Sequence, residues 1–287
     1  MKASHRSTPR VLATAIVWIS VVYFLTPLVW LLFSSTKSNI DLFSTFGLWF
    51  GRSFDLFENV ERTLTYSDGI FLQWLGNSVG YAAVSACGAA ILATMAGYAL
   101  AKFRFPGRGV LNVVIIGAIM VPVTALAIPT FLVFSEFGLT NTPLAVILPS
   151  LLNPFAVFLM REYTTAAVDD GLLEAARIDG AGEMRILVTI SLPLLSPGIA
   201  SVLLLTAIAT FNNYFLPLIM LSSTGLLPVT VGLAQWNAQG GSNGAMGVSF
   251  FPMVMTGSVI ATIPLIIAFL FLQRYWQSGL ATGAVKA

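Results

Sequence analysis

Six long apolar runs alternate with polar segments along the chain, and none of the six holds a charged residue. The runs cover about residues 11–33, 71–101, 109–134, 143–160, 193–221 and 250–273. A helix needs about 17 to 25 apolar residues to cross the hydrocarbon core of a bilayer, and each run reaches that length. The pattern therefore predicts an all-α polytopic membrane protein, with one transmembrane domain over residues 1–287 and six transmembrane helices.

The composition of the chain supports this interpretation. Of the 287 residues, 57% are hydrophobic and only 9% are charged, whereas soluble domains are typically about 25% charged. The net charge of +2 and the scattered basic residues argue against a nucleic-acid partner. The single cysteine, Cys87, and the single histidine, His5, indicate no disulfide and no metal site, and we expect no catalytic residue because no span holds a charged group.

The distribution of Lys and Arg over the loops predicts the orientation, because cytoplasmic loops retain an excess of basic residues. Eleven of the 14 fall on one side of the predicted topology: Lys2, Arg6, Arg10, Lys102, Arg104, Arg108, Arg161, Arg177, Arg185, Arg274 and Lys286. The other side holds Lys37, Arg52 and Arg62. We therefore expect both termini and the segment 161–192 in the cytoplasm, and the loops 34–70 and 222–249 outside.

The segment 161–192 contains a polar stretch that predicts two short helices around a glycine corner. Asp169 or Asp170 can cap a first helix over residues 172–179, and Gly180 then supplies the left-handed conformation that ends it. A second helix is expected over about residues 183–190. Apolar positions at helical spacing make both arms amphipathic, so each arm must cover an apolar side.

Seven residues of this segment and of the span that follows it have a specific spacing: Glu174, Ala175, Ala176, Gly180, Ile190, Leu192 and Pro193. One interpretation is a plain connector, with Glu174 paired to Arg177 on the same helix. The spacing nevertheless resembles, without a mismatch, the signature of binding-protein-dependent ABC importer permeases. The stretches Asn77-Ser78, 211–218, 227–233 and 279–287 are similar to the carbohydrate-type branch of that family, and within it to the shorter maltose-type subunit.

This resemblance implies the type I importer permease fold, in which the segment 161–192 forms cytoplasmic coupling helices that bind in a cleft of an ATPase. The chain would be a permease subunit in the inner membrane, forming half of the pathway of an ATP-driven importer of a mono-, di- or oligosaccharide or a related polyol. The expected partners are a second homologous permease, an ATPase dimer, membrane lipid, and an extracytoplasmic sugar-binding protein facing the loop 222–249. The chain itself is expected to bind no cofactor, because none of its lysines lies in a P-loop, and the ATPase would use ATP and Mg²⁺.

Polar side chains within the spans are candidates for the substrate pathway, because an amide in hydrocarbon needs a polar partner or water. The candidates are Asn77, Asn153, Asn212, Asn213 and Tyr214. The last three are neighbours, and amides beside an aromatic ring suit a neutral hydroxylated ligand. The alternative for each is an interhelical hydrogen bond, worth about 0.6 kcal/mol on average.

Prolines inside the spans predict kinks, since each removes an intrahelical hydrogen bond. They are Pro122, Pro129, Pro217, Pro252 and Pro264. An alternative function is a self-sufficient secondary transporter or channel, which usually has inverted repeats or intramembrane charges. The sequence shows neither feature, and the permease interpretation is preferred.

Overall fold

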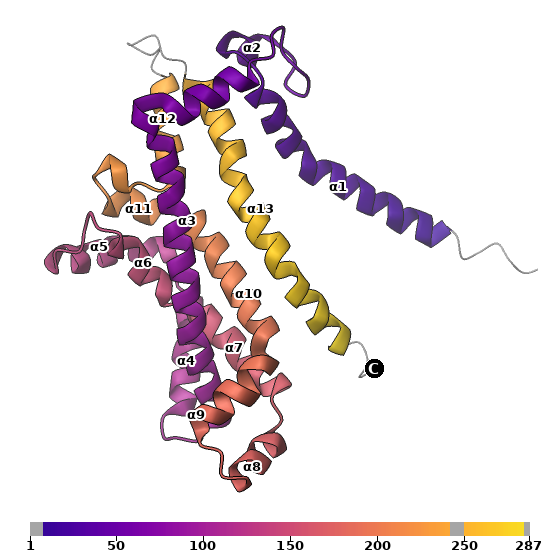
Figure 1. Ribbon diagram of the computed structural model, residues 1–287, viewed down its shortest axis with the longest axis vertical. Helices are drawn as coiled ribbons and strands as arrows, with labels where there is room; N and C mark the ends of the chain where they lie inside the picture. Colours follow the sequence, from indigo (N-terminus) through magenta and orange to yellow (C-terminus); the bar gives the residue numbers. More distant parts are fainter. Residues whose placement is uncertain (1–7, 242–249, 284–287) are drawn as a thin grey trace, which may run out of the picture. The chain divides into compact units, whose positions relative to one another are not determined.

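The computed structural model describes the backbone of residues 8–241 and 250–283, and the regular elements in these ranges are all helices (Figure 1). The described part of the chain is therefore all-α, as predicted. Two compact units can be separated, one from Met1–Phe71 with Leu233–Thr262 and the other from Leu72–Gly232 with Ile263–Ala287. Three helices have residues in both units, namely α3 (Leu56–Lys102), α12 (Val229–Gly241) and α13 (Phe250–Gly283).

Five described helical stretches are long and apolar enough to cross a membrane: Val11–Ser35, Leu56–Lys102, Leu144–Ala167, Glu183–Phe211 and Phe250–Tyr275. A sixth span is obtained if the bent pair Arg108–Ile119 and Val123–Glu136 is counted as one. Each of these overlaps one of the six apolar runs of the sequence. Length and hydropathy alone thus place every long helix of the described ranges on a predicted run.

The third apolar run, 109–134, forms a sharply bent pair in place of one straight helix. Its two helices, α4 (Arg108–Ile119) and α5 (Ala127–Glu136), are joined through a 3₁₀ turn, Val123–Leu126, and the axis bends by 96°. Pro122 lies at the break with an extended ψ of 123°. Since proline has no N–H and disfavours helical geometry in the residue before it, the ladder of α4 cannot continue through this point.

The first unit contains α1 (Thr8–Ser35), α2 (Asn39–Ser44) and a small hydrogen-bonded cap between α2 and α3. Asp41 is buried and accepts hydrogen bonds from the backbone N–H groups of Arg52 and Ser53, at 2.8 and 3.2 Å. Lys37 is also buried, and its Nζ donates to the carbonyl oxygen of Phe46 at 2.7 Å. The part of the predicted loop 34–70 that precedes α3 therefore folds into a defined cap, because each of its two buried charges has hydrogen-bonding partners, whereas residues 56–70 already belong to α3.

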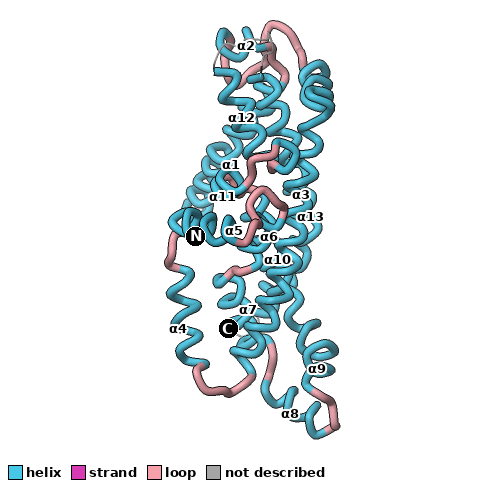
Figure 2. Tube along the Cα trace, turned by 90° about the vertical axis from the view of Figure 1, so that its left-hand side faces the viewer, coloured by secondary structure: helices cyan, strands magenta, loops and turns pink. Residues whose placement is uncertain are grey.

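The second unit holds most of the remaining helices. In chain order after α5 they are α6 (Leu144–Leu151), α7 (Pro154–Ala167), α8 (Asp170–Ile178), α9 (Glu183–Ile186), a π-helical stretch (Leu187–Ser191), α10 (Leu192–Phe211), α11 (Phe215–Met220) and a 3₁₀ turn (Thr224–Leu226). Short loops separate α6 from α7, α10 from α11 and α8 from α9, and Figure 2 shows the last of them at the lower end of the tube. These pairs are interrupted within this unit, whereas α3 is continuous from Leu72 to Lys102.

Close backbone packing holds α7 between α3 and α10 in the second unit. A Cβ atom added at Gly97 of α3 would lie 2.7 Å from the backbone nitrogen of Arg161 in α7. A Cβ atom added at Gly198 of α10 would lie 2.9 Å from the ring of Tyr163. Small residues at such contacts are typical of helix association in membranes, where packing replaces the hydrophobic drive.

Candidate functional site

The corner between α8 and α9 has the geometry that the sequence predicts for Gly180. Gly180 has a φ of 82°, and the N–H groups of Gly180 and Ala181 donate to the carbonyl oxygens of Arg177 and Ala176, both at 3.0 Å. These two bonds, closed around a left-handed glycine, make a Schellman motif that satisfies the last carbonyls of α8. The corner is therefore fixed by the backbone itself, and the first arm ends where the sequence places its stop.

Two interactions fix the start of α8. Asp169 caps the helix, with its Oδ1 accepting the N–H of Gly171 at 2.7 Å. Lys102, the last residue of α3, donates from Nζ to the carbonyl oxygen of Val168 at 2.5 Å and to Oδ1 of Asp170 at 2.6 Å. The hydrogen bond that Lys102 donates to the Asp170 carboxylate, together with the positive charge of Lys102, lowers the pKa of Asp170 below its ordinary value of 3.8. The sequence singled out the cap, but it gave no partner for Lys102.

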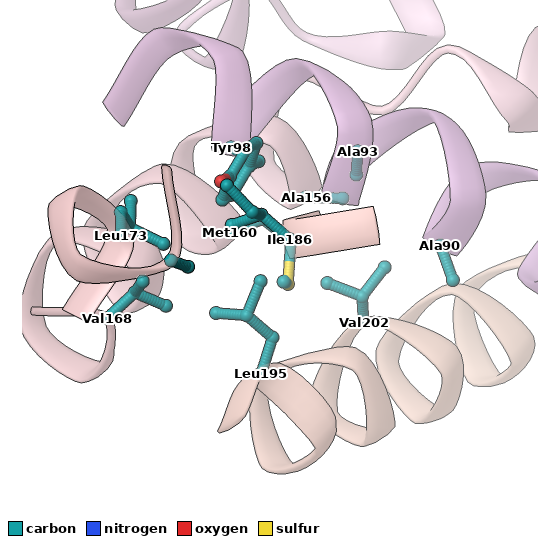
Figure 3. Close-up of a cluster of buried hydrophobic side chains, with 11 residues drawn as sticks. Ala90, Ala93, Tyr98, Ala156, Met160, Val168, Leu173, Ile186, Leu195 and Val202 are labelled. Atoms are coloured by element: carbon teal, nitrogen blue, oxygen red, sulfur yellow. The ribbon is translucent and has the colours of Figure 1, made fainter. Parts of the chain in front are cut away.

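The apolar sides of both arms pack against the chain's own helices (Figure 3). Leu173 of α8 and Ile186 of α9 are 2% and 0% exposed, and they join a cluster with Tyr98 of α3, Met160 of α7 and Leu195 of α10. Ala176 of the signature is buried in the same cluster. Since α3, α7 and α10 all contribute side chains, a displacement of α8 or α9 is transmitted directly to these three helices.

The second arm differs from the separate helix expected over residues 183–190. α9 contains only Glu183–Ile186, and the π-helical stretch Leu187–Ser191 then leads without a break into α10. Ile190 lies in this stretch, and Leu192 and Pro193 form the first residues of α10. The second arm is therefore the N-terminal part of the spanning helix that continues as α10. Its π-helical turn is wider than an α-helical turn because it contains one extra residue.

The ion pair at the corner is not the one that we would expect if the segment were a plain connector. Arg177 forms a two-pronged ion pair with Glu183 across Gly180, with Nε to Oε1 at 2.6 Å and Nη2 to Oε2 at 3.2 Å. This pair lowers the pKa of Glu183 and raises that of Arg177. The ion pair of Arg177 is therefore with Glu183 and not with Glu174, the partner that the connector interpretation assumed, and Glu174 only adds a Coulombic contribution that raises the pKa of Arg177. Within the described ranges, the exposed Glu174 carboxylate forms no hydrogen bond and no ion pair.

Four apolar side chains of the two arms are exposed in the described part of the chain, and one of them, Met184, also lines a cavity with residues of α3 and α10. Leu172, Ile178, Met184 and Val188 are 44%, 85%, 66% and 51% exposed. Ala175 of the signature and the unpaired Glu174 lie on α8 and are also exposed. We call the four apolar residues and Glu174 the coupling face. A rigid corner with an apolar face and one free carboxylate can dock into a complementary protein groove.

The candidate pathway residues fall at the helix interruptions, with one exception. Asn153 caps α7 by accepting the N–H of Ala156 at 3.1 Å, and Asn212 donates to the carbonyl oxygen of Ile208 at 3.0 Å. Asn213 lines a mainly apolar cavity of about 660 Å³ together with residues from the α4–α5 bend, while Tyr214 is 42% exposed. Asn153 and Asn212 therefore satisfy backbone groups at the helix breaks, and Asn213 faces a cavity.

Asn77 is the exception, because its amide is used on a distant segment of backbone. Its Nδ2 donates to the carbonyl oxygens of Gly225 and Leu227, at 2.7 and 3.1 Å, and these residues are nearly 150 positions away in the chain. Trp74 and Tyr81 of the same helix bind the same segment. The sequence alone did not single out Trp74 and Tyr81, although the polar tips of Trp74, Asn77 and Tyr81 recur at the spacing of one helical face.

Comparisons with known proteins give a consistent assignment. Residues 89–281 match the sequence profile of the family described as binding-protein-dependent transport system inner membrane component. The chain is 31% identical to an arabinooligosaccharides transport system permease protein of Bacillus subtilis, with 98% of this chain and 97% of the relative covered. It is 33% identical to a trehalose/maltose transport system permease protein of Thermococcus litoralis, with 80% and 81% covered.

The fold also matches a solved structure. A chain in the crystal structure of a bacterial ABC transporter involved in the import of the acidic polysaccharide alginate superposes with a TM-score of 0.81. The match covers 96% of this chain and 100% of that chain, at 24% sequence identity. The helical arrangement described above is therefore one that an ABC importer uses.

Proposed function

Since the chain belongs to the family of binding-protein-dependent transport system inner membrane components, we propose that it carries a neutral sugar across the membrane in an ATP-driven importer. Members of this family are the multi-pass inner membrane subunits of ABC importers and are not themselves catalytic. They work with an ATPase and with a substrate-binding protein. The proposal therefore assigns substrate passage to this chain and ATP hydrolysis, with its Mg²⁺, to a partner.

A saccharide is supported as the substrate by the printed functions of the relatives. They transport arabinooligosaccharides, lactose, and trehalose or maltose, and the first of these shares 35% identity over 218 residues with this chain. The pathway candidates Asn212, Asn213 and Tyr214 carry no charge, which suits a neutral hydroxylated ligand. An arabinose-, glucose- or galactose-containing oligosaccharide is accordingly the proposed substrate class.

The coupling face is the proposed docking site for the ATPase, and it carries the mechanistic part of the proposal. Its apolar residues are exposed in the chain alone, while other apolar residues of the same arms, such as Leu173 and Ile186, are packed in a cluster with α3, α7 and α10. Burying the face against a partner would remove this apolar surface from water, and the free Glu174 can pair with a basic residue of that partner. A charge pair of this kind fixes the register of the two proteins more than it adds affinity.

The assembly around the chain is part of the same proposal. A second homologous permease would complete the translocation pathway, with the termini and the coupling face in the cytoplasm, as the distribution of basic residues favours. The alternative of a self-sufficient secondary transporter or channel is not favoured, because the chain belongs to a family of binding-protein-dependent transport components and a relative named as a transport system permease protein covers 98% of it.

The first test identifies the partners. The tagged chain would be purified in mild detergent from cells that express its natural partners, and the attached subunits would be identified by mass spectrometry. The complex would then be placed in proteoliposomes and supplied with ATP and a panel of arabinobiose, trehalose, maltose and lactose. ATP-dependent uptake of one of these sugars supports the proposal, whereas uptake without the ATPase subunits supports the alternative.

The second test addresses coupling at the corner. We expect Gly180→Val to abolish ATP-coupled uptake while the chain stays in the membrane, because valine at a φ of 82° is strained by about 1–2 kcal/mol or more. Gly182→Val is the matched control, since both glycines have open space where the side chain would go but Gly182 has a φ of −71°. Equal uptake by the two variants would contradict the coupling role of the corner.

A further inference from the structure

The last residue of α3, Lys102, holds the junction between α7 and α8. Its side chain is 5% exposed, and its Nζ is bound at once to the carbonyl oxygen that ends α7, at Val168, and to Asp170 in the first turn of α8. A buried ammonium group requires such partners, because its desolvation is costly without them. Removing the charge therefore releases the start of α8 from α3.

The inner end of α3 is also packed directly on the helices that lead into the coupling loop, residues 161–192. Gly97 brings the backbone of α3 against that of α7, with only 2.7 Å between an added Cβ and the nitrogen of Arg161. Tyr98, on the next position, is 3% exposed and belongs to the cluster that contains Leu173 and Ile186. The final turns of α3 consequently touch α7, α8 and α9, with Lys102 as the polar connection.

The first turns of α3 after its break at residues 66–69 are also bound, to residues 222–230, which we call the outer strap. Trp74 Nε1 donates to the carbonyl oxygen of Thr224 at 2.8 Å, and Tyr81 Oη donates to that of Leu226 at 2.9 Å. Asn77 binds two further carbonyl oxygens of the strap, and Ser78 accepts the N–H of Val229 at 2.8 Å. Side chains on one face of the helix thus hold the strap through its backbone.

The outer strap continues to a pathway candidate. Thr230, at its end, donates from Oγ1 to the carbonyl oxygen of Asn213 at 2.9 Å, in the interruption between α10 and α11. The beginning of the strap is fixed by Asn141, whose Oδ1 accepts the N–H groups of Ser222 and Ser223. A displacement of α3 along its axis would therefore move the backbone beside Asn213.

The helix between these two attachments is unbroken. No proline lies between Leu72 and Lys102, and the α-helix is unbroken over that length, which corresponds to roughly 42 Å from Trp74 to Lys102 at about 1.5 Å per residue. Its neighbours α4–α5, α6–α7 and α10–α11 are each interrupted. Figure 1 shows this part of α3 running beside α10 toward α8 and α9.

We propose that α3 is a strut that carries movement of the coupling face to the outer strap and Asn213, and that Lys102 is the positioning residue that makes α3 follow α8. This inference rests on the proposed function, in which an ATPase moves the coupling face. Lys102 touches no substrate in this role. It transmits force because its two bonds join α3 to the α7–α8 junction.

The test uses the assembled complex in proteoliposomes and measures both ATP hydrolysis and uptake of the panel sugar that the wild-type complex transports. Lys102→Met keeps the length of the side chain but removes its charge, and we expect uptake per ATP hydrolysed to fall about 2- to 30-fold, the range of mutations that disturb coupling between sites. Lys102→Arg retains donors for both acceptors and should restore most of the ratio. Arg104→Met is the control for loss of charge alone, because this exposed arginine acts on Asp170 only through its charge and forms no hydrogen bond or ion pair with α8.

A second variant tests the outer end in case Lys102→Met does not assemble. Tyr81→Phe removes one hydroxyl group and its bond to Leu226, and the strut predicts the same fall in uptake per ATP with the ATPase still active. The double variant Lys102→Met with Tyr81→Phe should be no worse than the more severe single variant, since both interrupt one connection. Additive losses would contradict the strut.

The outcomes separate this inference from the proposed function. If Gly180→Val uncouples the complex while Lys102→Met and Tyr81→Phe keep the wild-type ratio, the coupling role stands and the strut is refuted. If the wild-type complex takes up none of the panel sugars in an ATP-dependent way, the proposed function fails, and the strut fails with it.

Discussion

Replacing Gly97 by alanine adds one methyl group where α3 and α7 touch backbone to backbone. The new Cβ would lie 2.7 Å from the nitrogen of Arg161, 2.7 Å from Cβ of Met160 and 2.8 Å from its carbonyl carbon. Two of these three atoms belong to the backbone, so no side chain can rotate away to relieve the overlap. The helices must separate instead.

The size of the effect follows from these distances. Carbon atoms prefer separations of about 3.5–4.0 Å, so α3 and α7 must move apart by roughly 1 Å. Overpacking of this kind costs about 1–3 kcal/mol. Alanine also gains up to about 1 kcal/mol of helix propensity over glycine. The same gain is available at Gly80 of α3, where nothing lies within 4 Å of an added Cβ. The difference between the two variants therefore isolates the steric term.

Thermal unfolding of the purified full-length chain in mild detergent provides the assay, with tryptophan fluorescence as the signal. At about 2–4 °C per kcal/mol for domains of 150–250 residues, Gly97→Ala should unfold about 2–12 °C below Gly80→Ala. Gly80→Ala should unfold at or above the temperature of the wild type. Equal unfolding temperatures for the two variants would refute the backbone contact, and with it the packing that supports the inner end of the strut.

Two further predictions concern charge and pathway. Because Arg177 lowers the pKa of Glu183 below its ordinary value of 4.5, the stability from this pair is present above that value and is lost as the pH falls through the lowered pKa. The difference in unfolding temperature between wild type and Glu183→Gln should accordingly be constant from pH 6 to 8 and vanish in acid; a difference that grows in acid would contradict the pairing. Asn212→Leu and Asn213→Leu should each impair uptake of the panel sugar while basal ATPase activity of the complex persists. Normal uptake by both variants would remove these amides from the pathway.

The sequence predicted the elements whose cause is local. The lengths of the apolar runs gave the long helices, because crossing hydrocarbon depends on composition over about 20 residues. Asp169 and Gly180 marked the beginning and end of α8, because a cap and a left-handed glycine act on their own backbone. Pro122 likewise marked a break by its missing N–H, although the angle of 96° did not follow from it.

The tertiary structure decided which distant groups meet. The sequence left Arg177 free to pair along its own helix, but the folded corner brings Glu183 to it from across Gly180. Asn77 appeared as a pathway amide, yet its partners are backbone atoms of the outer strap. In the sequence, Lys102 was only one of the basic residues that predict the orientation in the membrane. The fold brings it, at the end of α3, into contact with the α7–α8 junction.

The seven signature residues illustrate both what the sequence predicts and what only the tertiary structure decides. Their spacing indicated the family and Gly180 indicated a corner, because the corner is built from neighbouring positions, while its cytoplasmic side stays a prediction from the distribution of basic residues. The division between the buried Ala176 and the exposed Glu174 and Ala175 required the structure. Periodicity defines the apolar face of a helix, but only the packing of α3, α7 and α10 determines which apolar residues it covers and which it leaves on the coupling face.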